Sequence, residues 1–474
     1  MSTLQSLAHF KTEIILLIGA FITLFSDSPK GSRFLAGTAA LLTLTLAGVA
    51  AFTEASQQSL QLFGGFFTLD GATRFFRFGM ILAAAASVLL GMTRGAIALS
   101  FFAESTALML FLTFGLIVLC ASGHFLTLLL AVEMVSLLSY LMTGFSPQNT
   151  RAREAALKYL LLGSFCSAFM LYGISLLFGL TGSLDFDSVR AAVQDGGQRT
   201  AAAASLLFIL TGAGFKLSLF PFHFWAPDVY EAAPSPVAAY LTVAPKAAAC
   251  AILIRLFSEV FPSMQTFGAE VLQTLCILTL LAASLLALAQ TRVRRLIAYS
   301  SMAQAGYLLM GLSLFSREGL QAAFFYLAAY GAANLGVFAA LTALSQRGTQ
   351  DHLEDLTGAA WRNPFAAGCL TVFLLSLAGL PPLAGFLGKF WIFAAALKEG
   401  EVFLVVTAAL TSMIGIFYYF KILRTLYFSD PLIALCAAPT PLPLRILLIL
   451  LASAVTAAGL FPSWLLRAAE SALR

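Results

Sequence analysis

The stretch FKLSLFPFHFW, residues 215–225, ends a long apolar run that begins near Ala201. Lys216, Pro221 and His223 interrupt this run, although the residues around them are apolar enough to enter a lipid bilayer. A charged side chain at the centre of a bilayer costs at least about 2.5–3.5 kcal/mol, and proline removes a helix hydrogen bond. The fold must therefore compensate for three unfavourable residues in one segment.

The composition indicates an integral membrane protein. Of the 474 residues, 60% are hydrophobic and only 10% are charged, whereas soluble domains are about 45–50% apolar and about 25% charged. The six cysteines are scattered singly, and no CxxC pair, GxGxxG loop or P-loop occurs. The sequence therefore predicts that this chain itself binds no metal, iron–sulfur cluster or nucleotide.

The apolar runs predict an all-α polytopic membrane protein with about fourteen transmembrane helices, because a crossing helix needs roughly 20 apolar residues. The longest polar stretches, 183–199 and 345–363, are too short to form separate domains. The candidate spans are 12–28, 35–53, 73–92, 105–121, 124–144, 154–180, 200–226, 235–259, 268–288, 294–315, 319–344, 364–395, 401–427 and 444–468.

The distribution of basic residues predicts the orientation. An even number of spans places both termini on one side of the membrane. With the termini outside, the inner connections hold thirteen lysines and arginines, including Lys30, Arg94 and Arg347, and the outer connections hold ten. Basic residues favour the cytoplasmic side, so we expect both termini to be periplasmic.

Four of the eight lysines lie within predicted spans, whereas all nineteen arginines are assigned to span ends and connections. Arginine stays protonated in proteins, but a desolvated lysine can have its pKa lowered by several units. The preference for lysine indicates groups that take up and release protons. These lysines are Lys158, Lys216, Lys246 and Lys389.

An acidic residue supports this interpretation. Glu133 lies in the middle of the span 124–144, within LAVEMVSLLSY, so its carboxylate must be paired or protonated. The next span begins REAALKYLLL, and the short connection makes it an antiparallel neighbour. We therefore expect Lys158 to be the partner of Glu133, with coupled protonation of the two groups.

Simpler interpretations remain open for each residue. Lys158 lies about one turn inside its helix, so it can reach the membrane interface or pair locally with Glu154 at i,i+4. The three deeper lysines can be statically paired, and His223 can be an ordinary buried histidine. Asp228 and Glu231 are most simply loop residues or helix caps.

Two predicted spans are interrupted by proline. Pro221 breaks the span 200–226, and Pro381 and Pro382 break the span 364–395 within LAGLPPLAGFLGKFW, residues 377–391. Each break has a lysine nearby, and paired interrupted helices mark transport sites in repeat-built transporters. The opening stretch is therefore interpreted as a hinge that carries protons, and Lys246, which follows Pro245, extends the path.

Several stretches together resemble a known family. GFKLSLFPFHFWAPDVYEAAPSPVAAYLTVAPKAA, residues 214–248, resembles the central signature of the subunit N family of bacterial NADH–quinone oxidoreductases, the complex I type enzymes. VEMVSLLSY, EAALKYLLLGSF, RRLIAYSSMAQAGYLL and LAGLPPLAGFLGKFWIF match further family stretches in the expected order. The resemblance covers about residues 105–430.

This resemblance implies an antiporter-like fold of fourteen helices, with two inverted five-helix repeats at helices 4–8 and 9–13 and discontinuous helices 7 and 12. It divides the chain into three N-terminal helices (1–104), a first repeat (105–262), a second repeat (263–430) and a C-terminal helix (431–474). Gln304 departs from the family, where histidine is common, and cannot act as a proton relay. The family roles fall on Glu133 and Lys158 as the coupled pair, Lys216 as the central relay, His223 and Lys246 as connecting groups, and Lys389 at the exit half-channel.

The implied function is proton translocation by a membrane subunit of an NADH–quinone oxidoreductase, a translocase whose redox chemistry takes place in other subunits. NADH, FMN, iron–sulfur clusters and quinone are then expected in partner subunits, which include sister antiporter-like subunits, and no nucleic acid is involved. The implied location is the bacterial inner membrane. A subunit of a Mrp-type sodium/proton antiporter or membrane-bound hydrogenase is the alternative, and a scaffold without ion traffic is a third class.

Overall fold

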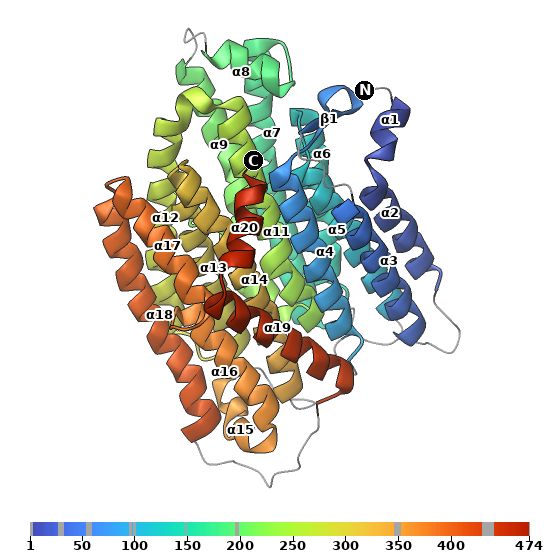
Figure 1. Cartoon of the computed structure of the whole chain (residues 1–474), viewed down its shortest axis with the longest axis vertical. Coiled ribbons are helices and arrows are strands. Elements are labelled where there is room, and N and C mark those ends of the chain that lie inside the picture. The colour runs from blue at the N-terminus through green and yellow to red at the C-terminus, as the bar shows by residue number, and fades with distance from the viewer. Residues whose placement is uncertain are drawn as a thin grey trace.

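The computed structural model describes residues 3–26, 33–53, 59–93, 97, 101–146, 149–194, 199–345, 352–428 and 440–473. These residues form a bundle of long helices that run in alternating directions, with one small β-hairpin at its edge (Figure 1). The all-α membrane fold predicted from the sequence is confirmed in outline, since the hairpin has only two short strands.

Eleven helices of the described part of the chain are long and apolar enough to cross a membrane. Each coincides with one predicted span or with its larger part. They are α3 (Arg33–Thr53), α4 (Gly71–Gly91), α5 (Phe102–Cys120), α6 (Phe125–Thr143), α7 (Thr150–Thr181), α9 (Arg199–Leu217), α11 (Ser235–Arg255, continued by a π-helix, η3, Leu256–Val260), α12 (Gln265–Leu288, preceded by η4, Pro262–Met264), α14 (Arg317–Leu344), α18 (Val402–Phe428) and α19 (Leu442–Leu460).

The remaining predicted spans are also helical, but they fall short in length or apolar character. They correspond to α2 (Lys11–Leu24), α13 (Val293–Ser313) and the pair α16 (Pro364–Ala378) and α17 (Ala384–Lys398). The number fourteen therefore stays a prediction. The span 444–468 is two helices, because α19 ends before Pro462, which lacks a backbone donor, and α20 (Ser463–Ala472) follows.

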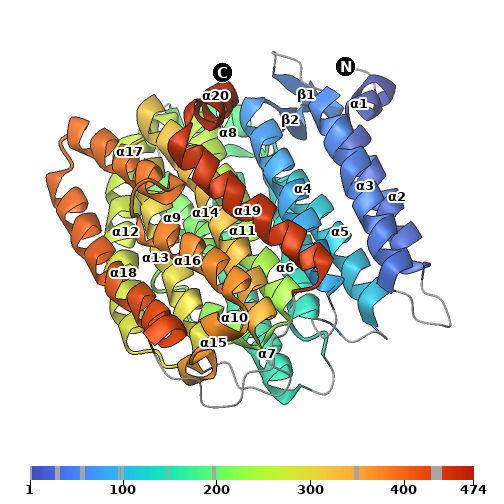
Figure 2. The same ribbon diagram turned by 60° about the horizontal axis from the view of Figure 1, so that its bottom comes forward.

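The shorter elements gather at the two ends of the bundle. At one end, which we call the hairpin face, β1 (Leu60–Leu62) pairs antiparallel with β2 (Phe67–Leu69) around η1 (Phe63–Gly65). The hairpin face also carries α1 (Thr3–Ala8), α8 (Phe186–Gln194) and α20 (Figures 1 and 2). The opposite face carries α10 (Ala226–Ala232) and α15 (Ala359–Arg362), and η5 (Leu353–Leu356) directly precedes α15 in the chain.

Contacts at the hairpin face bring the first and the last described helices to the same end of the bundle. The backbone N–H of Phe63 donates to Ser6 Oγ at 3.1 Å, which ties the hairpin to α1. The start of α4 packs against α20, where a Cβ on Gly71 would lie 2.6 Å from the Ser471 carbonyl oxygen. The first and last described residues therefore lie at the same end of the bundle, and the side of the membrane that this end faces stays a prediction. Lys30, Arg94 and Arg347, on which the predicted orientation depends, lie outside the described residues.

Two buried arginines correct the expectation that arginine is confined to span ends and connections. Arg77 in α4 is 1% exposed and pairs with buried Glu13 of α2. Arg255 ends α11 and is also buried, where it donates to Cys120 O, Thr68 O, Thr73 Oγ1 and two carboxylates. A fork of donors can satisfy several acceptors at once, so these arginines stabilise helix packing.

The two predicted interruptions are confirmed. α9 ends at Leu217 and α10 begins at Ala226, with Pro221 between them. α16 ends at Ala378 and α17 begins at Ala384, and Gly379 closes α16 with a φ of 83°, a left-handed conformation that glycine adopts without steric cost. Both breaks lie among packed helices, where neighbouring protein groups can satisfy the released backbone atoms.

Candidate functional site

The second break holds Lys389. This side chain lies in α17, is 6% exposed, and donates from Nζ to the carbonyl oxygens of Leu377 at 3.0 Å and Ala378 at 3.4 Å. It also donates to Ser412 Oγ at 3.2 Å and lies 4.5 Å from the centre of the Tyr307 ring. Its partners are neutral groups, as expected for a charge stabilised by dipoles and an aromatic face.

The sequence explains why two carbonyls are free for this lysine. In a continuous helix, the carbonyl of residue i accepts from the N–H of residue i+4. The residues four positions after Leu377 and Ala378 are Pro381 and Pro382, which have no N–H. The diproline therefore leaves both acceptors unused by the backbone, and the end of α16 presents them to Lys389 with the negative end of the helix dipole.

Lys246 lies in α11 and is completely buried. Its Nζ donates to the carbonyl oxygen of Ser301 at 2.5 Å and to Ser301 Oγ at 2.6 Å. The Ser301 hydroxyl is also 2.7 Å from the Tyr330 hydroxyl, which donates to the carbonyl oxygen of Thr242 at 2.7 Å. A lysine of the first predicted repeat is therefore bound by a residue of the second.

The first break contains Lys216 and His223, and both side chains are 2% exposed. Lys216 Nζ and His223 Nδ1 have no hydrogen-bond partner in the described structure. The His223 ring stacks on two aromatic rings, with its centre 5.5 Å from that of Phe220 and 4.4 Å from that of Phe224. Buried polar atoms are normally satisfied by protein or by ordered water, so unpaired atoms in a native fold require a functional or solvation explanation.

The prediction that Glu133 and Lys158 form an ion pair is wrong, because Lys158 has other partners in this structure. Lys158 is 47% exposed and pairs with Glu154 at 2.8 Å and with Asp228 at 2.9 Å. Glu133 instead lies within electrostatic range of Lys216. The short connection correctly predicts that α6 packs beside α7. Lys158, however, lies on the exposed side of α7, where it binds Asp228 on α10. The local i,i+4 pairing that the sequence left open for Lys158 is present.

Asp228 and Glu231, interpreted from sequence as loop residues or caps, form a charged cluster at the opposite face. Arg295 Nη1 donates to Asp228 at 2.6 Å and to Glu231 at 3.1 Å, and Arg292 also pairs with Glu231. We call this group the Asp228 cluster, and its members are Glu154, Lys158, Asp228, Glu231, Arg292 and Arg295.

The Asp228 cluster connects three helices. Asp228 on α10 binds Lys158 on α7 and Arg295 on α13. Burial acts to raise the pKa of Asp228, but hydrogen bonds from Lys158 and Arg295 outweigh it and hold the pKa below its usual range. The carboxylate therefore stays ionised at neutral pH. The signal in the sequence was the i,i+3 spacing of two acids opposite the basic stretch TRVRR.

Sequence reasoning also missed a polar group around Gln304, which is 1% exposed. Its Nε2 donates to Leu377 O at 3.1 Å and to the Tyr419 hydroxyl at 2.9 Å, and its Oε1 accepts from the Tyr326 hydroxyl. The Tyr419 hydroxyl is 2.5 Å from Ser300 Oγ. Only the spacing of Ser300 and Gln304 on one helix face hinted at this group.

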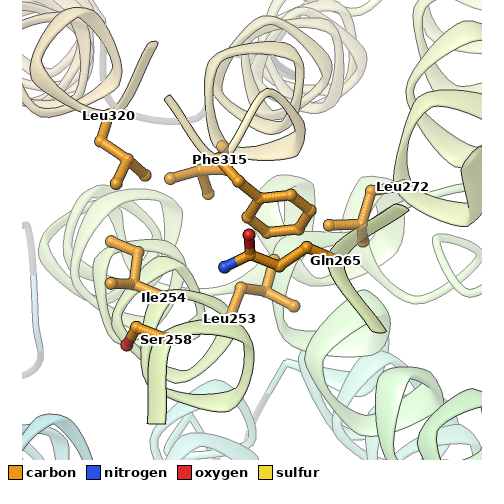
Figure 3. Close-up of a pocket in the computed structure, with 8 residues that line it drawn as sticks. Leu253, Ile254, Ser258, Gln265, Leu272, Phe315 and Leu320 are labelled. Atoms are coloured by element: carbon orange, nitrogen blue, oxygen red, sulfur yellow. The ribbon is translucent and has the colours of Figure 1, made fainter. Parts of the chain in front are cut away.

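A small, mostly apolar pocket lies near the hairpin face, between the end of α11 and the starts of α12 and α14 (Figure 3). None of the predicted relay residues lines it. Its lining is Leu253, Ile254, Ser258, Gln265, Leu272, Leu312, Phe315 and Leu320. The pocket is therefore separate from the chain of buried lysines.

Long apolar helices, two breaks and buried lysines beside them define a polytopic membrane protein of the antiporter-like class. A family model described as "NADH:quinone oxidoreductase/Mrp antiporter, TM" matches residues 122–415. The NADH-quinone oxidoreductase subunit N of Parvibaculum lavamentivorans is 35% identical over 436 residues, which cover 91% of this chain and 89% of the relative. The chain therefore belongs to the NADH:quinone oxidoreductase/Mrp antiporter transmembrane family, and its predicted resemblance to subunit N is confirmed.

Solved structures agree with this assignment. A chain of respiratory complex I from Thermus thermophilus, solved with bound aureothin, is 33% identical with a TM-score of 0.81, over 96% of this chain and 98% of that chain. A chain of the Mrp complex from a Dietzia species is 21% identical with a TM-score of 0.87, over 99% of this chain and 97% of that chain. The second likeness is one of fold, and the curated relatives do not favour the Mrp alternative.

Proposed function

We propose that this chain is a proton-translocating subunit of an NADH–quinone oxidoreductase, and that its own side chains carry protons across the membrane. In this proposal the chain has no redox centre, and NADH, FMN, iron–sulfur clusters and quinone are bound by partner subunits. The assembly then acts as a translocase in the bacterial inner membrane, with both termini of this chain in the periplasm. The division at residues 104, 262 and 430 is part of the same proposal.

The observation that carries the proposal is the set of three deeply buried lysines, none of which forms a salt bridge within the described residues. Lys246 and Lys389 bind only neutral oxygens, and Lys216 Nζ has no hydrogen-bond partner. An amine locked against a carboxylate keeps its proton, whereas an amine held by neutral groups can exist with or without it. Such amines suit proton exchange.

The proposed roles follow these surroundings. Glu133 is the acid that acts on Lys216, and Lys216 is the central relay at the first break. His223 continues the path within the same break, since neutral imidazole both accepts and donates a proton. Lys246 and Lys389 continue it through the second half of the chain. Lys158 contributes through the Asp228 cluster at the face opposite the hairpin face, because its ammonium is paired with Glu154 and Asp228 there.

The test is proton pumping by the assembled complex in membrane vesicles after Lys216→Met. We expect NADH-driven proton uptake to fall at least about tenfold, because an uncharged thioether cannot exchange a proton. The matched control is Lys398→Met, since Lys398 is 66% exposed and pairs with Glu318 at 2.7 Å. Electron transfer to an artificial acceptor reports assembly. Normal pumping by an assembled Lys216→Met complex would contradict the relay role of Lys216.

Copurification tests the identity of the complex. If the proposal is right, affinity purification of this chain brings down subunits that carry FMN and iron–sulfur clusters, together with NADH oxidation activity. Purification with sodium/proton antiporter subunits alone, without flavin or iron, would instead support the Mrp alternative.

A further inference from the structure

Gln304 binds the same backbone carbonyl that accepts a hydrogen bond from Lys389. Both side chains donate to the same atom, the carbonyl oxygen of Leu377, at 3.1 Å from Gln304 Nε2 and 3.0 Å from Lys389 Nζ. This carbonyl is the last but one of α16, and Pro381 removes its ordinary backbone partner. The two donors therefore share a carbonyl that the backbone of α16 does not hold.

The hydrogen bonds around Gln304 permit one orientation of its amide. A backbone carbonyl only accepts, so the NH₂ end must face Leu377 O. The amide oxygen then faces Tyr326, whose hydroxyl donates to it, and the second amide hydrogen reaches the Tyr419 hydroxyl at 2.9 Å. These three hydrogen bonds fix the orientation of the buried amide.

Gln304 also lies between the two lysine sites. It is on α13, one turn after Ser300 and Ser301. Ser301 binds Lys246 directly, while Ser300 is 2.5 Å from the Tyr419 hydroxyl that Gln304 also contacts. One helix face thus positions the acceptors of Lys246 and Lys389. An amide does not titrate near neutral pH, so Gln304 itself passes no proton.

We propose that Gln304 is a positioning residue for Lys389: it holds the Leu377 carbonyl where the lysine amine binds it, and it does not carry protons. This inference rests on the proposed function, because it assigns a role relative to Lys389 in proton translocation. Position 304 then requires a neutral side chain that donates to Leu377 O and accepts from the Tyr326 hydroxyl.

The experiment measures NADH-driven proton uptake per NADH oxidised in membrane vesicles that contain the assembled complex. Gln304→Met keeps the length of the side chain but removes its donor and acceptor. We expect uptake to fall about three- to tenfold, the effect of losing the one neutral hydrogen bond that positions the Leu377 carbonyl. Gln304→His restores a donor and an acceptor on one neutral ring, and we expect uptake within about twofold of the parent.

A double variant separates positioning from general packing. If Gln304 acts through Lys389, Gln304→Met combined with Lys389→Ala pumps as Lys389→Ala alone does, because the interaction is already lost. Independent losses that multiply in the double variant would overturn the inference. The matched control is Gln265→Met, which removes a similar glutamine bond to a backbone carbonyl, from Nε2 to Phe257 O at 3.0 Å, beside no lysine.

The outcomes distinguish this inference from the proposed function. Normal pumping by Lys389→Ala would contradict the relay role of Lys389 and, with it, the inference. A defect in Lys389→Ala together with normal pumping by Gln304→Met would overturn only the inference. If Gln304→Met does not assemble, Gln304→Asn replaces it, since the shorter amide keeps its polarity but cannot reach Leu377 and Tyr326 together. Normal pumping by an assembled Gln304→Asn complex would again overturn the inference.

Discussion

Lys158 Nζ donates to Asp228 Oδ2 at 2.9 Å, although the two residues are seventy positions apart in the sequence. Through this contact α7 is joined to α10, the short helix that follows the first break. Asp228 also binds Arg295 at the start of α13. The segment that carries His223 is therefore held at its end by charged residues from both predicted repeats.

Asp228→Asn is expected to lower the thermal stability of the complex, because hydrogen bonds between charged groups contribute about 1.5–3 kcal/mol each and two are weakened. The pKa of Asp228 is lowered in the fold, so its stabilisation is present above the ordinary aspartate pKa and is lost as pH falls through the lowered value. The difference in melting temperature between parent and variant should therefore be constant from neutral pH down to about pH 5 and shrink below about pH 4.

Asp187→Asn is the control for this experiment, since Asp187 is 58% exposed and pairs only with Arg190 among the contacts of the described residues. It should leave the melting temperature nearly unchanged. Equal melting temperatures for the parent and Asp228→Asn at pH 7 would show that the Asp228 cluster does not support the fold.

Glu133 is expected to be energetically coupled to Lys216 and not to Lys158. Glu133 interacts electrostatically with Lys216, whereas Lys158 forms ion pairs with Asp228 and Glu154. In double-mutant cycles on proton pumping, Glu133→Gln with Lys216→Met should deviate from additivity, while Glu133→Gln with Lys158→Met should be nearly additive. The reverse pattern would restore the pair that was predicted from the sequence.

Pro381→Ala is expected to impair proton translocation without preventing assembly. Alanine supplies an N–H four residues after Leu377, and this donor can compete with Lys389 for the Leu377 carbonyl. We expect pumping to fall at least about tenfold, as for the loss of one hydrogen bond to a charged group. Pro262→Ala, in η4 near the hairpin face, is the control and should pump normally. Unchanged pumping by Pro381→Ala would indicate that the freed carbonyl is not needed.

Gly385→Ala is expected to disturb the second break. A Cβ on Gly385 would lie 1.9 Å from the Ser376 carbonyl oxygen, so α16 and α17 would have to separate close to Lys389. Overpacking of this kind typically costs about 1–3 kcal/mol, and we expect less assembled complex and weaker pumping. Gly368→Ala in α16 is the control, because a Cβ there meets nothing within 4 Å. Equal yields and pumping of the two variants would contradict the close approach of the helices.

Much of the fold could be read from local sequence. The bilayer requires long apolar helices, so composition and run length predicted nearly every helix in its observed place. Proline cannot donate to the helix ladder, so Pro221, Pro381 and Pro382 predicted both breaks. The burial of Lys216, Lys246 and Lys389 followed from the same local argument, since each lies deep within an apolar run.

Only the tertiary structure decided which groups these side chains meet. The partner of Lys158 depends on the direction in which α7 presents it and on the return of the chain at α10, and neither follows from the spacing to Glu133. The acceptors of Lys389 are backbone carbonyls, and the Gln304 amide is held by tyrosines from two other helices. Hydrogen-bond partners are set by packing between helices distant in sequence, whereas helix length and helix breaks are set by each segment's own sequence.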